Sequence, residues 1–219
     1  YYHDQPVLAK GKIRFYGEPV VAIVAETLED AEEAEKGVEI TYKKLPVVSN
    51  IQEAIECKAV LHEDHPDNIV STTCVQKGNV EEGFKSSEII IEKDFSTQAV
   101  DHAYLETEAG ISYCDPDGTI VVKSCDQDIT HHRVLLAKIL GMPINKVRVI
   151  MSPVGGGFGG KEDMIYQAIL AIATLKTNQP VKLVFSREDS MIGSCKRHPV
   201  TMHYKIGLKS DGKIQAVKA

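Results

Sequence analysis

The sequence lacks tryptophan altogether, and aromatic residues of all kinds make up only 6% of its 219 residues. It also lacks an excess of positive charge. The 25 lysines and arginines are outnumbered by 31 aspartates and glutamates, which gives a formal net charge of −6. A nucleic-acid-binding surface needs a basic patch, so this balance argues against that class of partner. No apolar run approaches the roughly 18 residues that predict a membrane span.

Cysteines are few, and none of the five stands at C-x-x-C spacing from another. The residues present therefore predict neither an iron–sulfur cluster nor a structural zinc site. Scattered, odd-numbered thiols are typical of a reducing compartment, so we expect a cytoplasmic protein with unpaired, buried cysteines. His62 and His65 have a spacing that suits a metal, but a single pair in a loop rarely forms a site.

Hydrophobic residues make up 43% of the chain, enough for the core of one large or two small domains. The first residue is Tyr1 and not methionine, and Ala219 falls in an expected strand. We therefore expect the sequence to be a piece of a longer chain.

Residues 1–57 predict a small β-α-β domain that is truncated at its N-terminal side. Thr27 is a typical helix N-cap, with Asp30 three residues later, and Gly37 is a helix stop. Residues 58–84 have mixed composition, and we expect a linker there. The expected strands of the small domain are 13–15, 20–25 and 38–42, and its expected helices are 28–36 and 51–57.

Residues 85–219 predict a second, larger domain of mixed α/β structure, which makes the chain α+β as a whole. Period-two alternation indicates a strand over 104–114, and Gly141 ends one helix as a left-handed stop. The expected strands are 88–95, 104–114, 119–123, 147–151 and 181–185, with a hairpin over 202–218. The expected helices are 130–140 and 162–175.

The most informative stretch reads Gly155-Gly-Gly-Phe-Gly-Gly-Lys-Glu162. Five glycines in six positions leave the backbone nearly bare, so that main-chain N–H groups can touch a ligand. The run lies between an expected strand and an expected helix. Such a turn would aim N–H donors and a helix N-terminus at one point, which suits an anionic ligand.

Two nucleotide-binding motifs resemble this run without matching it. A P-loop, G-x-x-x-x-G-K-[ST], needs a hydroxyl after the lysine, but Glu162 stands there and its carboxylate would repel phosphates. The dinucleotide fingerprint G-x-G-x-x-G fits Gly155, Gly157 and Gly160 formally. Its ribose-binding acid comes late, however, and the turn follows strand-rich sequence instead of opening the fold. An NAD-dependent dehydrogenase remains an alternative.

Several segments resemble, in the same order, the xanthine dehydrogenase and aldehyde oxidase family of molybdenum hydroxylases, with bacterial purine dehydrogenases the nearest in pattern. Residues 154–162 look like the family's molybdopterin-site loop, and 102–106 like its H-x-x-L-E segment. Further similar segments are 16–26, Ser124-Cys-Asp-Gln127 in place of Ser-Thr-Gln, 140–149, Arg187-Glu188 and 196–199.

The resemblance implies a fold of a small hammerhead domain followed by the N-terminal part of a molybdopterin-binding domain. It implies an oxidoreductase that inserts water-derived oxygen at an electron-poor C–H of a purine or other N-heterocycle. The cofactor would be molybdenum held by molybdopterin or its cytosine dinucleotide, with iron–sulfur clusters and FAD on other domains or subunits. The implied holoenzyme is dimeric and includes the remainder of the molybdenum subunit.

The resemblance also assigns residues to roles. Gln127, Gly157, Phe158 and Gly159 would contact the cofactor, with Gln127 and Phe158 in the second coordination shell of the metal. Glycines on either side of Phe158 would allow close backbone approach, while its ring packs as an anchor. Glu162 would face the substrate, because aldehyde oxidases of this family generally carry an apolar residue there. An aldehyde substrate is therefore the alternative within the family.

Other polar residues are expected to be structural. His102, Glu106 and Glu108 would share one face of a strand and support the site without binding metal. His131 and His132 are expected to form a surface pair. No catalytic residue is expected in this chain, because the family's glutamate base lies nearer the C-terminus of the subunit, so these 219 residues alone should be inactive.

Overall fold

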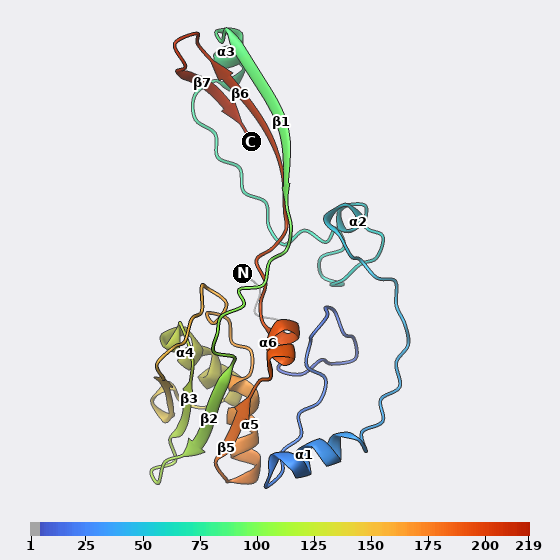
Figure 1. Cartoon of the computed structure of the whole chain (residues 1–219), viewed down its shortest axis with the longest axis vertical. Coiled ribbons are helices and arrows are strands. Elements are labelled where there is room, and N and C mark those ends of the chain that lie inside the picture. Colours follow the sequence, from blue (N-terminus) through green and yellow to red (C-terminus); the bar gives the residue numbers. More distant parts are fainter. Residues whose placement is uncertain (1–4) are drawn as a thin grey trace. The chain divides into compact units, whose positions relative to one another are not determined.

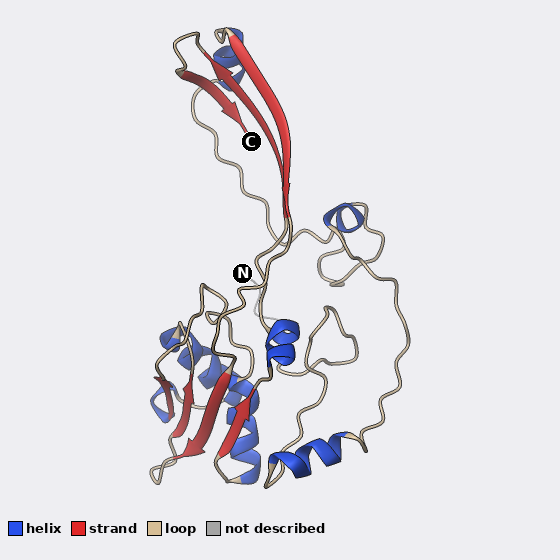
Figure 2. Ribbon diagram, viewed as in Figure 1, coloured by secondary structure: helices blue, strands red, loops and turns tan. Residues whose placement is uncertain are grey.

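The computed structural model describes residues 5–219 and consists of two compact units. Unit 1 combines the described residues up to Leu45 with Asp101–Lys196, and unit 2 combines Pro46–Val100 with Arg197–Ala219. Figure 1 labels the helices and strands along the chain, and Figure 2 separates helix, strand and loop by colour.

Three helices come first along the described chain and are followed by mixed strands and helices, with one short 3₁₀ helix at Ile144–Lys146. The α-helices are α1 (Leu28–Glu35), α2 (Ile51–Ile55), α3 (Val80–Lys85), α4 (Ile129–Leu140), α5 (Gln167–Thr177) and α6 (Arg187–Gly193). The β-strands are β1 (Ile89–Thr97), β2 (Ala109–Cys114), β3 (Ile120–Ser124), β4 (Val147–Met151), β5 (Val181–Val184), β6 (Val200–Leu208) and β7 (Ile214–Lys218).

Unit 1 is built on a mixed sheet with the strand order β4-β3-β2-β5. Strands β3 and β4 run parallel, with Ser124 opposite Met151, and α4 connects them. Strand β2 lies antiparallel to both β3 and β5. The parallel pair matters for function, because the loops that follow two adjacent parallel strands leave the sheet at the same edge.

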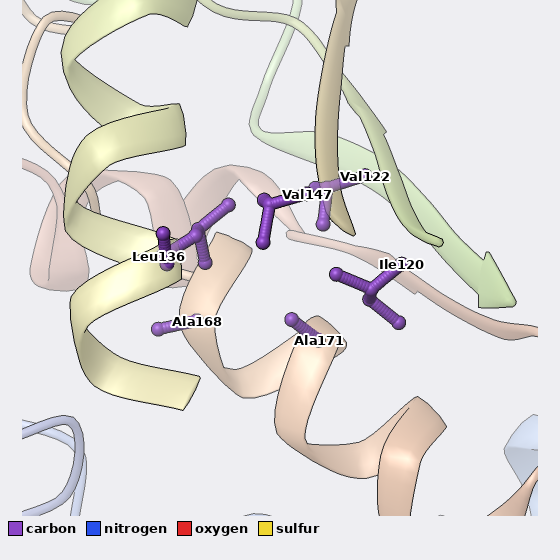
Figure 3. Packing of buried hydrophobic residues seen from close by; sticks show 7 residues of the cluster. Ile120, Val122, Leu136, Val147, Ala168 and Ala171 are labelled. Carbon is purple, nitrogen blue, oxygen red and sulfur yellow. The ribbon is translucent and has the colours of Figure 1, made fainter. Parts of the chain in front are cut away.

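Helices α4 and α5 pack on one face of this sheet, as the close-up of the core shows (Figure 3). The strand side chains are β-branched and pack flat, while two alanines let α5 lie close to them. The parallel strands that lead to the two loops are thereby fixed against both helices. The labelled core residues are Ile120 and Val122 of β3, Val147 of β4, Leu136 of α4, and Ala168 and Ala171 of α5.

Unit 2 contains an antiparallel sheet with the order β1-β6-β7. Its longest pairing runs from Ile89 opposite Leu208 to Thr97 opposite Val200. Helix α3 packs on this sheet so closely that a Cβ on Gly83 would lie 2.9 Å from the Cβ of Ala216 in β7. The hairpin β6–β7 confirms the turn that the sequence predicts at Ser210-Asp211-Gly212.

Several expected elements are confirmed. Strand β4 has the predicted bounds, and α4 ends at Gly141 in the left-handed conformation, with φ 64°. Helix α1 begins at the predicted cap, where the Thr27 Oγ1 accepts a 3.1 Å hydrogen bond from the Asp30 N–H. The described chain also holds no helix that is long and apolar enough to cross a membrane.

The three strands expected in the small N-terminal domain are not formed among residues 5–45, where α1 is the regular element. A strand exists through hydrogen bonds to a neighbouring strand, and the described residues supply no such neighbour here. Apolar side chains of these extended segments consequently stay accessible, with Ile13 at 42% and Val21 at 49% exposed.

Two further expectations are wrong in extent. The strand predicted over 104–114 begins only at Ala109, because residues 101–108 form a loop whose side chains support the glycine run. The helix predicted over 162–175 begins at Gln167. The Gln167 side chain accepts the N–H groups of Ile165 and Tyr166, so it satisfies the backbone just before the helix.

Candidate functional site

The candidate site lies wholly within unit 1, at the edge where β3 and β4 end. Gln127 follows β3 after two buried residues, and the glycine loop, residues 154–162, follows β4. The Ser152 N–H continues the ladder past the strand end with a 2.9 Å hydrogen bond to the Ser124 carbonyl. The two predicted cofactor-binding segments are therefore held side by side by the sheet itself.

Gln127 is fastened to the glycine loop by two reciprocal hydrogen bonds to Lys161. Its N–H donates to the Lys161 carbonyl, and its Oε1 accepts from the Lys161 N–H, both at 3.1 Å. Its carboxamide also lies on Gly157, where a Cβ would stand 2.2 Å from Oε1. Glycine at 157 thus makes room for the Gln127 side chain, a different role from the close cofactor approach that the sequence predicts.

The loop backbone adopts conformations that few side chains tolerate. Gly156 and Gly159 have φ of 99° and 88°, and Phe158, which is not glycine, has φ 54°. A non-glycine residue in this region costs of order 1–3 kcal/mol and is typical of functional loops. The turn is closed by a 2.8 Å hydrogen bond from the Gly160 N–H to the Gly157 carbonyl.

The amides at the tip of the loop lack acceptors among the described residues, although Gly157 itself is buried. Among residues 5–219, the N–H groups of Gly156, Gly157, Phe158 and Gly159 have no hydrogen-bond acceptor. The space beside Gly159 is open, since no atom lies within 4 Å of a Cβ placed there. The Phe158 ring is 75% exposed, so the expectation that it packs as an anchor is wrong.

Glu106 braces the start of the loop from the opposite side. Its carboxylate accepts 2.8 Å contacts from the Gly155 N–H and the Lys161 Nζ, while its own N–H donates to the Gly155 carbonyl. The Lys161 ammonium is buried and lies 4.6 Å from the centroid of the Tyr104 ring. Although partial burial raises the pKa of Glu106, the Lys161 ammonium and the Gly155 N–H hold it below its ordinary value.

His102 contacts the glycine loop, and Glu108 acts through Tyr104, whose ring also lies against Gly160. Both residues lie in the irregular segment 101–108 and not in the expected strand. Gly160 packs on the His102 ring so tightly that a Cβ there would lie 2.8 Å from Nδ1. Glu108 is buried and accepts a hydrogen bond from the hydroxyl of Tyr104. These contacts explain why Gly160 has no side chain.

His132 is completely buried, so the expectation that His131 and His132 form a surface pair is wrong. Its Nδ1 lies 2.6 Å from the Asp126 Oδ2, and its Nε2 lies 2.8 Å from the Glu162 carbonyl. The helix pattern does contain a signal for this burial. His132 precedes the buried Leu136 by four residues, which places both on one helix face.

Glu162 itself lies in an exposed turn, five residues before α5 begins at Gln167. Its backbone is fixed by the His132 contact at the carbonyl and by a 3.4 Å hydrogen bond from its N–H to the Gly159 carbonyl. The glycine turn therefore does not open directly into a helix N-terminus. The anion site expected from the helix dipole therefore does not apply here.

This geometry also bears on the two nucleotide-binding alternatives. Both motifs require the glycine turn to lead straight into the helix that receives the phosphates. Here residues 161–166 intervene before α5. The loop is closed on itself and presents free amides beside a neutral carboxamide.

Histidines, cysteines and acids do not gather into a metal-binding group of three or more anywhere among residues 5–219. His62 and His65 instead form a tight turn, in which the His65 N–H donates to the His62 carbonyl. The five cysteines form no disulfide, but only Cys125 is fully buried, whereas three are exposed. The expectation that the cysteines are buried is therefore wrong for most of them.

A bare loop backbone lies beside a carboxamide at the carboxyl edge of a mixed sheet, an arrangement that is typical of domains that bind a large ligand. The chain belongs to the molybdopterin cofactor-binding domain family, which matches residues 61–219. Residues 2–46 match a second family, the a/b hammerhead domain of aldehyde oxidase and xanthine dehydrogenase. The fold and family expected from the sequence are thereby confirmed.

Curated relatives support this assignment over almost the whole chain. The chain is 38% identical to the nicotinate dehydrogenase large molybdopterin subunit of Eubacterium barkeri, covering 98% of the chain and 50% of that protein. It is 36% identical to a probable xanthine dehydrogenase subunit of Bacillus subtilis, covering 97% and 28%. The chain thus spans half or less of the length of these relatives.

Solved structures give the same fold. Quinoline 2-oxidoreductase from Pseudomonas putida 86 superimposes with a TM-score of 0.90 at 25% identity, over 97% of this chain and 27% of that chain. The aldehyde oxidoreductase from Desulfovibrio desulfuricans has a TM-score of 0.90 at 26% identity, over 98% and 24%.

Proposed function

We propose that this chain forms part of a molybdenum hydroxylase that oxidises a purine or a similar N-heterocycle. The single observation that carries the proposal is the row of free amides at residues 156–159 beside the Gln127 carboxamide. Two of the relatives are named for nicotinate and xanthine, which are both nitrogen heterocycles. Water-derived oxygen would be inserted at an electron-poor C–H of the substrate.

The residues present fit a molybdopterin group by the chemistry of their donors. The amides of Phe158 and Gly159 are unused, and the open space beside Gly159 would be filled by any side chain. The Lys161 N–H donates to the Gln127 Oε1, which fixes the orientation of the carboxamide. Its Nε2 therefore remains available to donate a hydrogen bond to a ligand. A neutral amide can contact a metal–oxo group without adding charge to the site.

In this proposal the cofactor supplies the redox chemistry, and the protein supplies binding and orientation. Gln127 and the Phe158 amide would stand in the second coordination shell of the metal, with Gly157 making room for the Gln127 side chain. The side chain of Phe158, a residue that is 75% exposed, would be available to cover a bound cofactor. No side chain of these residues takes the role of the catalytic base, which we assign to a glutamate further along the full-length subunit.

Glu162 is proposed to contact the substrate. A carboxylate can accept a hydrogen bond from a ring N–H of a heterocycle, which an aldehyde lacking a ring nitrogen cannot offer. Its backbone is fixed at both the N–H and the carbonyl, so the exposed side chain starts from a defined position. An aldehyde substrate is the second candidate, because the Desulfovibrio desulfuricans neighbour is an aldehyde oxidoreductase.

The whole enzyme is proposed to be cytoplasmic and dimeric, and to pass electrons to iron–sulfur and FAD domains or subunits. The deciding experiment uses the full-length protein with its partners. Metal analysis should find molybdenum together with a pterin, and turnover should favour xanthine, hypoxanthine or nicotinate over benzaldehyde. NAD binding without molybdenum would reject the proposal. Turnover of benzaldehyde alone would support the aldehyde substrate instead of the heterocycle.

Glu162→Gln and Gln127→Ala separate substrate contact from cofactor contact. Glu162→Gln should raise KM for the heterocycle about 10-fold or more, as expected for loss of a charged hydrogen bond, and leave the molybdenum content unchanged. Gln127→Ala should lower kcat instead. Glu188→Gln is the matched control, because Glu188 is an exposed acid in the first turn of α6.

A further inference from the structure

The buried pair of Asp126 and His132 stands directly beneath the two candidate ligand-binding segments. Asp126 immediately precedes Gln127, and its carboxylate also accepts a 2.7 Å hydrogen bond from the Asp128 N–H and a 3.3 Å hydrogen bond from the Ser124 hydroxyl. His132 lies in the first turn of α4 and reaches the Glu162 carbonyl. One imidazole thus links the segment that carries Gln127 to the turn that carries Glu162.

The partners of His132 fix its protons. A carbonyl oxygen can only accept a hydrogen bond, so Nε2 must donate to Glu162. The Asp126 carboxylate accepts from Asp128 and Ser124, and a carboxylate can only accept, so Nδ1 donates to it. Both groups are fully buried, and a buried carboxylate without a counter-charge would be costly.

We infer that His132 is a doubly protonated positioning residue that sets the place of Glu162 relative to Gln127 and thereby tunes substrate binding. It does not touch the cofactor or the substrate. One residue before Glu162, Gln127 and Lys161 already form two reciprocal hydrogen bonds between the same two segments. The His132 contact adds a third link, and it is the one that bears on residue 162.

This inference rests on the proposed function for the identity of the substrate, but the link itself can be measured without substrate. In the full-length protein, His132→Ala should raise amide hydrogen exchange in the peptide that covers residues 158–166 at least 10-fold, because the local opening of this turn becomes easier. His131→Ala is the matched control, since His131 is an exposed neighbour on the same helix, with its side chain 50% exposed.

A conservative variant and a double mutant test whether the role is positioning. Asp126→Asn lets the asparagine side chain pair with Nδ1, so that a neutral His132 still donates from Nε2, and exchange at 158–166 should stay within about 3-fold of wild type. His132→Ala should raise KM several-fold with the molybdenum content unchanged. In a Glu162→Ala background it should raise KM no further, because the side chain that His132 positions is then already absent.

The possible outcomes distinguish this inference from the proposed function. Unchanged exchange in His132→Ala, or KM effects that multiply in the double mutant, would overturn the inference. Raised exchange together with absence of heterocycle turnover in wild type would reject the proposed function and leave the link standing. Raised exchange with non-additive KM effects would support both.

Discussion

The carboxamide of Gln127 occupies the position where a side chain of residue 157 would begin, with its Oε1 2.2 Å from the Cβ that Gly157 lacks. These residues are 30 positions apart, and they meet because each follows one of two adjacent parallel strands. The contact ties the conformation of the amide to the conformation of the glycine loop. A substitution at either residue should therefore alter the conformation of the other.

Gly157→Ala is expected to displace Gln127. The added methyl group would stand 2.2 Å from Oε1 and 2.5 Å from Cδ, so the side chain must turn away and lose its hydrogen bond from Lys161. We expect turnover by the full-length protein to fall about 100-fold or more, as for loss of a preorganised donor. Gly37→Ala is the control, because the nearest atom to its Cβ lies at 3.4 Å. Equal turnover in the two variants would contradict this interpretation.

Gly159→Ala tests whether the open space above the loop receives the cofactor. The new methyl meets no protein atom, but φ 88° is unfavourable for alanine and should cost about 1–2 kcal/mol of stability. Gly118→Ala provides the same strain in an equally open turn at φ 79°, away from the site. Both variants should lose similar thermal stability, but only Gly159→Ala should purify with less molybdopterin. Full pterin content in Gly159→Ala would place the cofactor elsewhere.

Much of the site's composition could be predicted from the sequence, because glycine density and residue order are local signals. The glycine loop is of this kind, whereas the roles expected of Gln127, His102 and Glu106 follow from the resemblance to the molybdenum hydroxylase family. What could not be predicted depends on tertiary contacts. The reason for glycine at 157 is visible only once β3 and β4 are paired.

The differences between expectation and structure have physical causes. Residues 162–166 favour helix locally, but α5 begins later because Tyr166 is drawn into the core, where its hydroxyl donates to the Ala109 carbonyl at 2.7 Å. Two adjacent histidines suggest a polar face, which favours a surface position for His132. Its spacing from Leu136, on the buried stripe of α4, is the stronger signal.

Glu106→Gln should weaken the loop without touching the cofactor. The amide oxygen can still accept from the Gly155 N–H, but the Lys161 ammonium, whose side chain is 1% exposed, loses its counter-charge. We expect a loss of about 2–4 kcal/mol, below the full value for a buried pair because the Glu106 side chain is 34% exposed. Calorimetry should show a Tm lower by about 5–10 °C.

The control for this change is Asp115→Asn, which removes one partner of a more exposed ion pair, where the Arg148 side chain is 58% exposed. Its Tm should shift by about 2 °C or less. A similar Tm shift in both variants would show that the Glu106–Lys161 pair contributes no more than a surface ion pair.

The ionisation of His132 predicts a pH dependence of stability. Although burial lowers the pKa of His132, the Asp126 carboxylate, the Glu162 carbonyl and the nearby Asp128 raise it overall above its ordinary value of 6.5. Because the folded-state pKa is the higher one, the stabilisation is complete below pH 6.5 and is lost as the pH rises through the folded-state value. The Tm difference between wild type and His132→Gln should therefore shrink from about pH 6 to about pH 9. A difference that stays constant over this range would show that His132 keeps one protonation state, and His131→Gln should display little pH-dependent difference from wild type at any point.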